Sequence, residues 1–324
     1  MIKVIDSFAD VQLSGEVFVV YDAAVAWIAE QIVSSREGIL GSVAIDASEQ
    51  TKTMDTVLLI CRSMMEAGLT REGEVVCIGG GITCDAGGFA ASIYKRGVSC
   101  VNVPTTLLSQ VDAGIGGKNG VNFLGYKNML GTIVQPRATY ICADALRTLP
   151  PRELRCGLAE MVKTFLIAEA AAYEELCSQG AGSYAAFISK AALIKASIVE
   201  EDPFKHGRRS VLNLGHTFAH GIEYVAARRG DDIAHGEAVA MGIILASRLG
   251  DRLHGTSLEA EISAGFERLG LPVNCPYSPE ELLTAMTKDK KGVGEKLRFV
   301  LLEGIGKPVF ELLDPSEAVK ILSR

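Results

Sequence analysis

The sequence predicts an α/β domain with a Rossmann-like parallel sheet, followed by a mainly helical (all-α) domain. In the first half, short apolar runs alternate with stretches of helical apolar spacing, the pattern of a parallel sheet flanked by helices. Around residues 143–151 the chain carries paired prolines, and nearly everything beyond them has helical periodicity. The 324 residues are many for one hydrophobic core. We therefore expect two domains, residues 1–146 and residues 147–324.

The expected elements of the first domain follow one another as a β-α repeat. Strands are predicted from buried apolar runs, and helices from apolar residues at helical spacing. The expected strands are 16–21, 42–46, 74–78 and 98–103, and the expected helices are 23–33 and 53–68. Parallel strands bring their carboxyl ends to one edge of a sheet, where nucleotides bind.

The second half is read as a series of helices. The expected helices are 153–169, 171–177, 183–201, 214–228, 236–249, 257–269 and 279–287. A charged stretch at 288–292, expected to be a loop, precedes a short apolar run at 297–302.

Composition and charge exclude several classes of protein. The hydrophobic content of 48% predicts a globular chain, and the net charge of -7 argues against nucleic acid or an anionic membrane as the main partner. The longest apolar runs are too short to span a bilayer, and the first residues do not form an export signal. Eight scattered cysteines without a Cys-x-x-Cys pair argue against disulfides and a thiolate zinc site. We expect a cytoplasmic protein.

Glycines and hydroxyl residues at the predicted strand ends favour phosphate binding. The run 79–81 is Gly-Gly-Gly and follows a strand directly, so its backbone can approach a pyrophosphate at a helix amino terminus. A simple tight turn is the alternative, because this is not the Gly-x-Gly-x-x-Gly spacing. Thr105 and Thr106 follow the next strand, and Lys118 comes directly after two glycines. We expect a flexible cationic loop there that suits phosphate.

Three histidines and a glutamate form a candidate metal site. His216 and His220 are four residues apart, on one face of a predicted helix, and His235 follows fifteen residues later. Glu160 and Lys163 are three apart on another helix. Ordinary polar positions and a surface ion pair are the alternatives. Two histidines and one glutamate are a recurrent ligand set of catalytic zinc, which predicts Glu160, His216 and His235 as ligands. His220 is then available for proton transfer or substrate contact.

These stretches together resemble the 3-dehydroquinate synthase family, within the wider group of sugar-phosphate cyclases. The resemblance covers most of the chain from 75 to 306, more loosely before it, and its motifs keep the family order. The motifs are GGGITCDAGGFAA from Gly79, YKRG from Tyr94, VPTTLLSQVD from Val103, GGK from Gly116, GLAEMVK from Gly157, LNLGHTFAH from Leu212, HGEAVA from His235 and DKK from Asp289.

The resemblance implies an activity, two cofactors and a partner. Family members convert 3-deoxy-D-arabino-heptulosonate 7-phosphate (DAHP), a phosphorylated keto acid, to 3-dehydroquinate and phosphate in the shikimate pathway. Tightly bound NAD is recycled in each turnover, and a divalent ion, Zn²⁺ or Co²⁺, polarises the hydroxyl and the ketone. The family also lends an arginine, matched here by Arg96, to the neighbouring subunit's site, which implies a homodimer.

The same resemblance assigns roles to individual residues. Besides the metal ligands Glu160, His216 and His235, the implied NAD contacts are Gly80, Gly81, Asp85, Thr105, Thr106, Lys127 and Thr148, with Asp22, Glu49 and Lys52 from the amino-terminal segment. The implied substrate contacts are Asp112, Lys118, Asn128, Lys163, Lys195, Arg209, Asn213, His220 and Lys290. The cationic members account for binding of an acidic substrate by an acidic chain.

The chain departs from the family pattern at three positions. Ser48 and Tyr126 stand where glycine is usual, and Asn119 stands where threonine is usual. The last two flank implied substrate and NAD contacts, so the loop geometry there is open. Whether Lys290 or Lys291 contacts substrate is also open.

Three other functions compete with this interpretation. A metal-dependent polyol dehydrogenase of the glycerol dehydrogenase type shares the architecture, but it typically uses an aspartate ligand and needs no phosphate cage. An inosose- or valiolone-forming cyclase takes a substrate without a carboxylate. Lys195 and Arg209 suit a carboxylate, so their presence favours a keto-acid substrate. A non-catalytic binding protein with the same fold is the third alternative. Loss of a metal ligand or of a substrate-binding lysine would favour it, and none of these residues is missing here.

Overall fold

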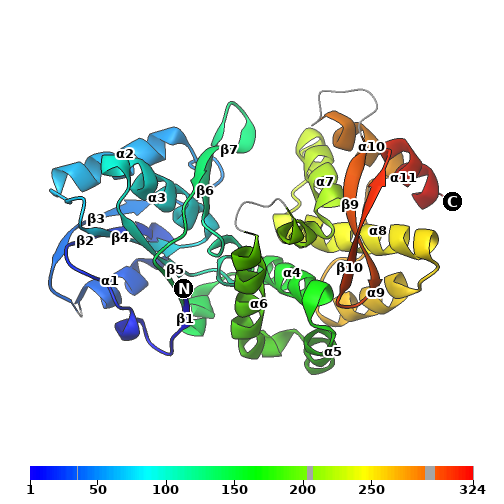
Figure 1. Cartoon of the computed structure of the whole chain (residues 1–324), viewed down its shortest axis with the longest axis horizontal. Helices are drawn as coiled ribbons and strands as arrows, with labels where there is room; N and C mark the ends of the chain where they lie inside the picture. Colours follow the sequence, from blue (N-terminus) through cyan, green and yellow to red (C-terminus); the bar gives the residue numbers. More distant parts are fainter. Residues whose placement is uncertain (35, 203–206, 289–295, 324) are drawn as a thin grey trace. The chain divides into compact units, whose positions relative to one another are not determined.

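The computed structural model (Figure 1) describes residues 1–34, 36–202, 207–288 and 296–323. The chain forms two compact units, which we describe separately. Unit 1 is Met1–Leu154 with Ile188–Glu200, and unit 2 is Arg155–Phe187 with Glu201–Arg324. The predicted domain boundary between residues 146 and 147 stays a prediction. The segment Ile188–Glu200, which follows that boundary in the sequence, belongs to unit 1.

Unit 1 is built on a parallel sheet of six strands in the order β1-β8-β5-β4-β2-β3. The strands are β1 (Ile2–Val4), β2 (Val17–Asp22), β3 (Ile39–Ile45), β4 (Glu74–Gly79), β5 (Ser99–Pro104) and β8 (Ala138–Ile141). The four strands that the apolar runs predict are confirmed, and the parallel α/β class with them. The sequence analysis missed β1 and β8, which are three and four residues long.

Helices cover both faces of this sheet because alternate strand residues point to opposite sides. On one face, Val17, Val19 and Ile78 pack with Ile28 and Ile32 of α1 (Ala26–Ser34). On the other, Phe18, Val75 and Cys77 pack with residues of α2 (Met54–Glu66) and α3 (Gly81–Ile93). The sheet is thereby held between two apolar layers.

An antiparallel hairpin replaces the flexible cationic loop expected around residues 116–128. It pairs β6 (Lys118–Phe123) with β7 (Tyr126–Ile133), and Val121 of β6 is buried in the core beside α3. A Cβ at Gly88 of α3 would overlap the side chain of Asn119. The expectation of a flexible loop was wrong because this segment has ladder partners of its own.

Unit 2 is mainly helical, as predicted. Its helices are α4 (Pro151–Ala168, shared with unit 1 at its start), α5 (Ala170–Gln179), α7 (His216–Arg229), α8 (His235–His254), α9 (Leu258–Arg268), α10 (Pro279–Lys288) and α11 (Pro315–Leu322). The unit also contains an antiparallel pair, β9 (Leu297–Gly304) and β10 (Lys307–Leu313), of which the sequence showed only an apolar run. The remaining long helix, α6 (Ile188–Glu201), lies almost wholly in unit 1.

Short turns connect these elements. The short helical segments of one or two turns are Phe8–Asp10, Ala23–Val25, Tyr94–Arg96, Ser109–Ala113, Ala143–Thr148, Ala181–Phe187 and Arg208–Asn213. In the part of the chain that the structure describes, no helix combines the length and the apolar character that crossing a bilayer requires.

Candidate active site

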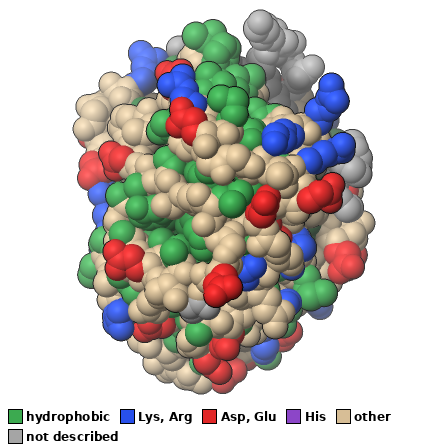
Figure 2. Space-filling view, turned by 90° about the vertical axis from the view of Figure 1, so that its left-hand side faces the viewer, with side chains coloured by type: hydrophobic (Ala, Val, Ile, Leu, Met, Phe, Trp, Pro, Cys, Tyr) green, Lys and Arg blue, Asp and Glu red, His purple; other side chains and the backbone are tan. Residues whose placement is uncertain are grey.

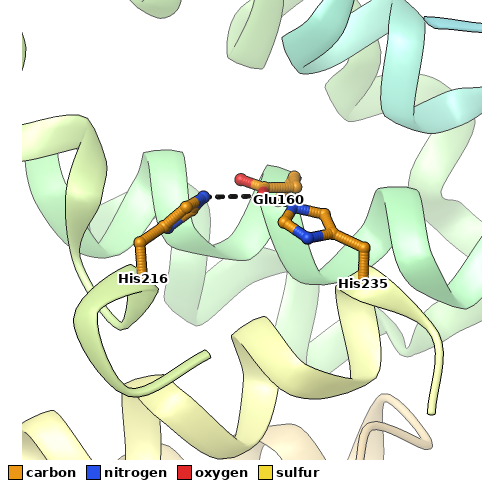
Figure 3. Close-up of side chains that lie close together, drawn as sticks. All are labelled: Glu160, His216 and His235. Atoms are coloured by element: carbon orange, nitrogen blue, oxygen red, sulfur yellow. Dashed lines mark ion pairs between the residues drawn. The ribbon is translucent and has the colours of Figure 1, made fainter. Parts of the chain in front are cut away.

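Glu160, His216 and His235 come together in unit 2, and one ligand atom from each lies within 4.8 Å of the others. Figure 3 shows the carboxylate of Glu160, on α4, facing two imidazoles that come from the start of α7 and of α8. Nε2 of His216 lies 3.4 Å from Oε1 of Glu160, and Nε2 of His235 lies 3.3 Å from the same oxygen. The sequence-based triad is thus a spatial cluster, and its role as a ligand set stays a prediction.

Glycines let the three helices approach closely enough to form this cluster. A Cβ at Gly236 would overlap the backbone of Cys156, one turn before Glu160 on α4. A Cβ at Gly242 of α8 would overlap the carbonyl of Gly215, which adopts a left-handed conformation (φ +76°) just before His216. Any larger residue at these positions would force the helices apart. The spacing of the ligands therefore depends on residues that carry no functional group.

The outer nitrogens of both imidazoles have oxygen partners. Nδ1 of His216 lies 3.2 Å from the carbonyl oxygen of Leu214, and Nδ1 of His235 lies 3.4 Å from Oε1 of Glu223. A carbonyl and a carboxylate only accept hydrogen bonds, so each favours the tautomer with the proton on Nδ1. Each ring then turns Nε2 toward the centre of the cluster, and Nε2 is the nitrogen through which it would bind a metal.

The charges of the cluster also fit a divalent cation. Glu160 is fully buried, and neither of its carboxylate oxygens has a hydrogen-bond partner of standard geometry among the described residues. Burial alone would raise the pKa of Glu160, but the ammonium of Lys163 and the ring of His216 hold it well below its usual range. Burial likewise works against the charged form of His235, yet the carboxylates of Glu160 and Glu223 raise its pKa to about 10. Glu160 therefore presents a charged carboxylate to the two imidazoles, and the Glu-His-His donor set suits Zn²⁺ or Co²⁺.

The other substrate candidates of unit 2 lie at different distances from the cluster. Lys163 is buried and forms an ion pair with Oε2 of Glu160, and the exposed ring of His220 has its centroid 5.8 Å from that of His216. Arg209 is buried in the turn that ends at Asn213, three residues before His216, and its backbone N-H donates to Asp202. Lys290, Lys291 and the rest of 289–295 lie outside the described residues.

The carboxyl edge of the sheet in unit 1 presents the predicted phosphate-binding backbone. Gly80 precedes the first turn of α3 at the end of β4. Thr105 follows β5, and its N-H donates to the carbonyl of Gly79 over 2.9 Å, so the ends of β4 and β5 are adjacent. A Cβ at Gly80 or Gly81 would come to 3.0 Å from Thr106 or Ala113. This edge therefore combines a helix amino terminus with closely packed, side-chain-poor backbone.

Lys52 joins two of the predicted contacts at this edge. Its Nζ lies 2.6 Å from Oδ2 of Asp85 and 2.6 Å from Oδ1 of Asn128. Asn122 holds the neighbouring residues: its side chain accepts the N-H of Asn128 and donates to the carboxylate of Glu49 at 2.8 Å. Burial raises the pKa of Asp85 to about 6, although Lys52 lowers it. One polar network thus links NAD and substrate candidates.

The remaining candidates of unit 1 are more scattered. Asp112 lies on a turn of π-helix and pairs with Lys195 of α6 at 2.5 Å. Asp22 accepts the N-H of Ala24 and so caps the turn after β2. Among the candidates not yet described, Arg96 (φ +68°), Lys118, Lys127 and Thr148 are exposed.

Sequence reasoning missed Glu223 and Asn122. Glu223 lies seven residues after His216, two turns along one face of α7, but its contact with His235 depends on how α7 and α8 pack. Asn122 sits in a hairpin that was read as a loop, so nothing in the pattern related it to Glu49.

Models of known families match most of the chain. The 3-dehydroquinate synthase N-terminal model matches residues 42–156, and the 3-dehydroquinate synthase C-terminal model matches residues 157–292. A 3-dehydroquinate synthase of Xanthomonas campestris is 40% identical over 299 residues, covering 88% of this chain and 81% of the relative. One of Pyrococcus furiosus is 38% identical over 292 residues, covering 89% and 85%.

Solved structures of related cyclases share the fold. A 2-epi-5-epi-valiolone synthase of Streptomyces hygroscopicus, with NAD⁺ and Zn²⁺ bound, aligns with a TM-score of 0.86 and 31% identity over 100% of this chain and 95% of its own. A 2-deoxy-scyllo-inosose synthase with carbaglucose-6-phosphate, NAD⁺ and Co²⁺ aligns with a TM-score of 0.81 and 25% identity, over 95% and 89%. A maleylacetate reductase of Agrobacterium tumefaciens, at 16% identity and a TM-score of 0.60 over 99% and 95%, shares the fold alone.

Proposed function

The chain belongs to the 3-dehydroquinate synthase family, and on that premise we propose that it converts DAHP to 3-dehydroquinate and phosphate. The observation that carries the proposal is the convergence of Glu160, His216 and His235 on one point. The reaction withdraws a hydride, eliminates phosphate, returns the hydride and closes a carbocycle. NAD supplies the reversible hydride transfer, and Zn²⁺ or Co²⁺ supplies Lewis acidity at the hydroxyl and the ketone.

The proposed work of unit 1 is to hold NAD by its backbone. The adjacent ends of β4 and β5 offer N-H groups and the helix dipole of α3 to a pyrophosphate. Gly80 and Gly81 leave room for its close approach. Asp85, held by Lys52, presents a carboxylate at the same edge. Carboxylates bind ribose hydroxyls in other dinucleotide sites, and we assign Asp85 that role.

The proposed work of unit 2 is to hold the ion and to guide protons. Glu160, His216 and His235 would ligate the ion, with Oε2 of Glu160 retained by the ammonium of Lys163. The ammonium of Lys163 would also bind the substrate phosphate as it leaves. His220, whose ring lies next to that of His216 and is exposed, is placed to exchange protons with the substrate. Arg209 of this unit is assigned to the substrate carboxylate, as is Lys195 of α6 in unit 1.

The test is incubation of the purified protein with DAHP, NAD and Zn²⁺. Inorganic phosphate and 3-dehydroquinate should appear in equal amounts, without net formation of NADH, because the hydride is returned within each turnover. A polyol dehydrogenase would instead accumulate NADH with a polyol. Phosphate release with no cyclic product, or no phosphate release at all, would contradict the proposal.

A second candidate function is formation of a valiolone, which the 31% identity and TM-score of 0.86 to the valiolone synthase favour. Parallel assays with DAHP, sedoheptulose 7-phosphate and glucose 6-phosphate separate the cyclases. We expect kcat/KM to be highest for DAHP, since Lys195 and Arg209 have no carboxylate to bind in the other two. Preference for sedoheptulose 7-phosphate would assign the chain to the valiolone-forming branch.

The proposal includes a homodimer in the cytoplasm, with Arg96 acting in the neighbouring site. Arg96 is exposed, and the surface of unit 1 carries large apolar side chains, including Leu59 and Met65 of α2 and Leu124 and Tyr126 of the hairpin. Figure 2 shows hydrophobic side chains gathered on one face, between scattered charges. Such surface is typical of subunit contacts.

Subunit mixing tests the shared site. In a dimer of one Arg96→Ala and one Glu160→Ala chain, one site keeps both residues if Arg96 acts across the interface. Random mixing of the two inactive variants should therefore restore about a quarter of the wild-type activity in a two-fold dimer. A mixture that stays inactive would contradict the crossover, and a monomeric mass in solution would contradict the dimer.

A further inference from the structure

We propose that Glu223 is a positioning residue for the metal centre, which it serves by fixing the ring of His235. The inference rests on the proposed function, because it concerns the same ion. It begins from one contact: Oε1 of Glu223 lies 3.4 Å from Nδ1 of His235, on the opposite side of the ring from Glu160.

Glu223 cannot serve as a further ligand to the same ion. The two nitrogens of an imidazole point in diverging directions, and Nε2 of His235 is the one that faces Oε1 of Glu160, at 3.3 Å. A carboxylate at Nδ1 is therefore separated from the ion by the ring itself. Its available effect is on the ring: it accepts the Nδ1 proton, fixes the tautomer and increases the electron density at Nε2.

The two histidines differ in how they are held, and this makes Glu223 testable. His216 is held by the backbone carbonyl of Leu214, which no substitution removes. His235 is held by a side chain from a different helix, two turns along α7 from His216. His235 is also the more exposed ring, with 37% of its side chain accessible against 15% for His216. The ring of His235 therefore has more freedom to rotate than that of His216, and its orientation depends more on its partner, Glu223.

Charge supports the same role. Within the cluster, the negative charge of Glu160 is balanced by Lys163, with which it forms an ion pair. Glu223 supplies a second negative charge, and its side chain is only 17% accessible, so solvent screens it little. This negative charge beside the ring of His235 favours a divalent ion bound at the other nitrogen of the ring.

The experiment measures metal affinity, independently of turnover. Chelator-treated protein is titrated with Co²⁺, followed by the visible absorption of the bound ion, and Zn²⁺ affinity is obtained by competition. The variants are Glu223→Ala, which removes both charge and acceptor, and Glu223→Gln, which keeps an acceptor of similar size. The control is Glu281→Gln. The carboxylate of Glu281, on α10, pairs with Arg229 at the end of α7, the helix that carries Glu223.

We expect Glu223→Ala to raise the Kd for either ion by about 10- to 100-fold and to shift the cobalt absorption bands, because the ring of His235 is no longer oriented. Glu223→Gln should lie between Glu223→Ala and the wild type, and Glu281→Gln should match the wild type. Glu223→Gln decides the question if Glu223→Ala does not fold, as judged by circular dichroism.

Three results would overturn the inference. One is a wild-type Kd and spectrum in both Glu223 variants, and another is an equal loss of affinity in Glu281→Gln, which would indicate a general weakening of α7. A wild-type protein that binds neither ion would overturn the proposed function as well. Tight wild-type binding with unaffected Glu223 variants would overturn this inference alone.

Discussion

The carboxyl edge of the sheet in unit 1 and the histidine-glutamate cluster in unit 2 are built by different means. At the sheet edge, the topology brings chain segments together, since Gly79 and Pro104 are register partners on parallel strands. The side chains there, such as Lys52 and Asp85, pair with one another. In the cluster, three side chains from three helices face one point, and the helices are held at the required spacing by glycines such as Gly236.

The difference reflects what each region would bind. A pyrophosphate is large and is recognised by several backbone N-H groups, so small changes in any one side chain are tolerated. A metal ion needs its ligand atoms within a few tenths of an ångström, which calls for fixed rings and fixed helix spacing. Substitutions in the cluster should therefore have larger effects than substitutions at the sheet edge.

The largest effect is expected for Glu160→Ala. It removes the ligand that both imidazoles face, so metal binding should be lost and turnover should fall by more than about 99%, while circular dichroism stays that of the wild type. The control Glu153→Ala changes an exposed glutamate on the same helix and should bind metal normally. Full activity of a metal-stripped sample would contradict the assignment, as would wild-type metal content in Glu160→Ala.

Lys163→Ala should slow phosphate release by about 100-fold, because the ammonium that we assign to the leaving phosphate is gone. The counterpart in unit 1 is Lys52→Ala, which should raise the KM for NAD and leave the rate of phosphate release at saturating NAD nearly unchanged. Single-turnover phosphate measurements separate the two. An unchanged rate in Lys163→Ala would remove Lys163 from the substrate set.

Gly236→Ala tests whether helix spacing sets the cluster. The added Cβ would overlap the backbone of Cys156, so we expect a loss of about 1–3 kcal/mol in the free energy of unfolding together with weaker metal binding. Gly182→Ala is the matched control, because a Cβ there meets no atom within 4 Å. If Gly236→Ala bound metal as tightly as Gly182→Ala, the dependence of the ligands on helix spacing would be refuted.

At the sheet edge, the expected effect is on the pH dependence of stability, through Asp85. Burial raises the pKa of Asp85 from 3.8 to about 6 in the folded chain, against the opposing charges of Lys52 and Lys195. The folded state therefore binds more protons than the unfolded state between these values, so stability falls as pH rises from about 4 to about 6.

Asp85→Asn should remove this component, which is on the order of 3 kcal/mol. Urea unfolding of both proteins in the absence of NAD, at several pH values, measures the difference. We expect the variant to gain stability relative to the wild type as pH rises through this window and to keep that gain above it. Parallel curves for the two proteins would show that Asp85 does not titrate in this way.

The sequence predicted those parts of the molecule whose pattern is local. The apolar runs at 74–78 and 98–103 became buried strands, and the helical spacing around Glu160 became α4. The triad could be proposed because its residue types are rare together, and the helices of unit 2 bring its members to one point. Short strands such as β1 carry too few residues for a pattern.

Other features depend on partners that are distant in the chain. The hairpin of β6 and β7 contains glycines and polar residues that are typical of a loop, and its pairing is set by ladder bonds and by contact with α3. The contacts of Gly236 and Glu223 cannot be predicted from the sequence, because they depend on how the helices pack against one another. Their roles depend on Cys156 and His235, which lie eighty and twelve positions away.

The account depends most on one divalent ion held by Glu160, His216 and His235. Anomalous diffraction at the zinc absorption edge, from crystals grown with Zn²⁺, tests it directly. We expect one strong peak in this cluster, at bonding distance from a carboxylate oxygen of Glu160 and from Nε2 of both histidines. An anomalous peak at a different site would contradict the account. So would the absence of a peak in this cluster if the crystallised protein turns over DAHP.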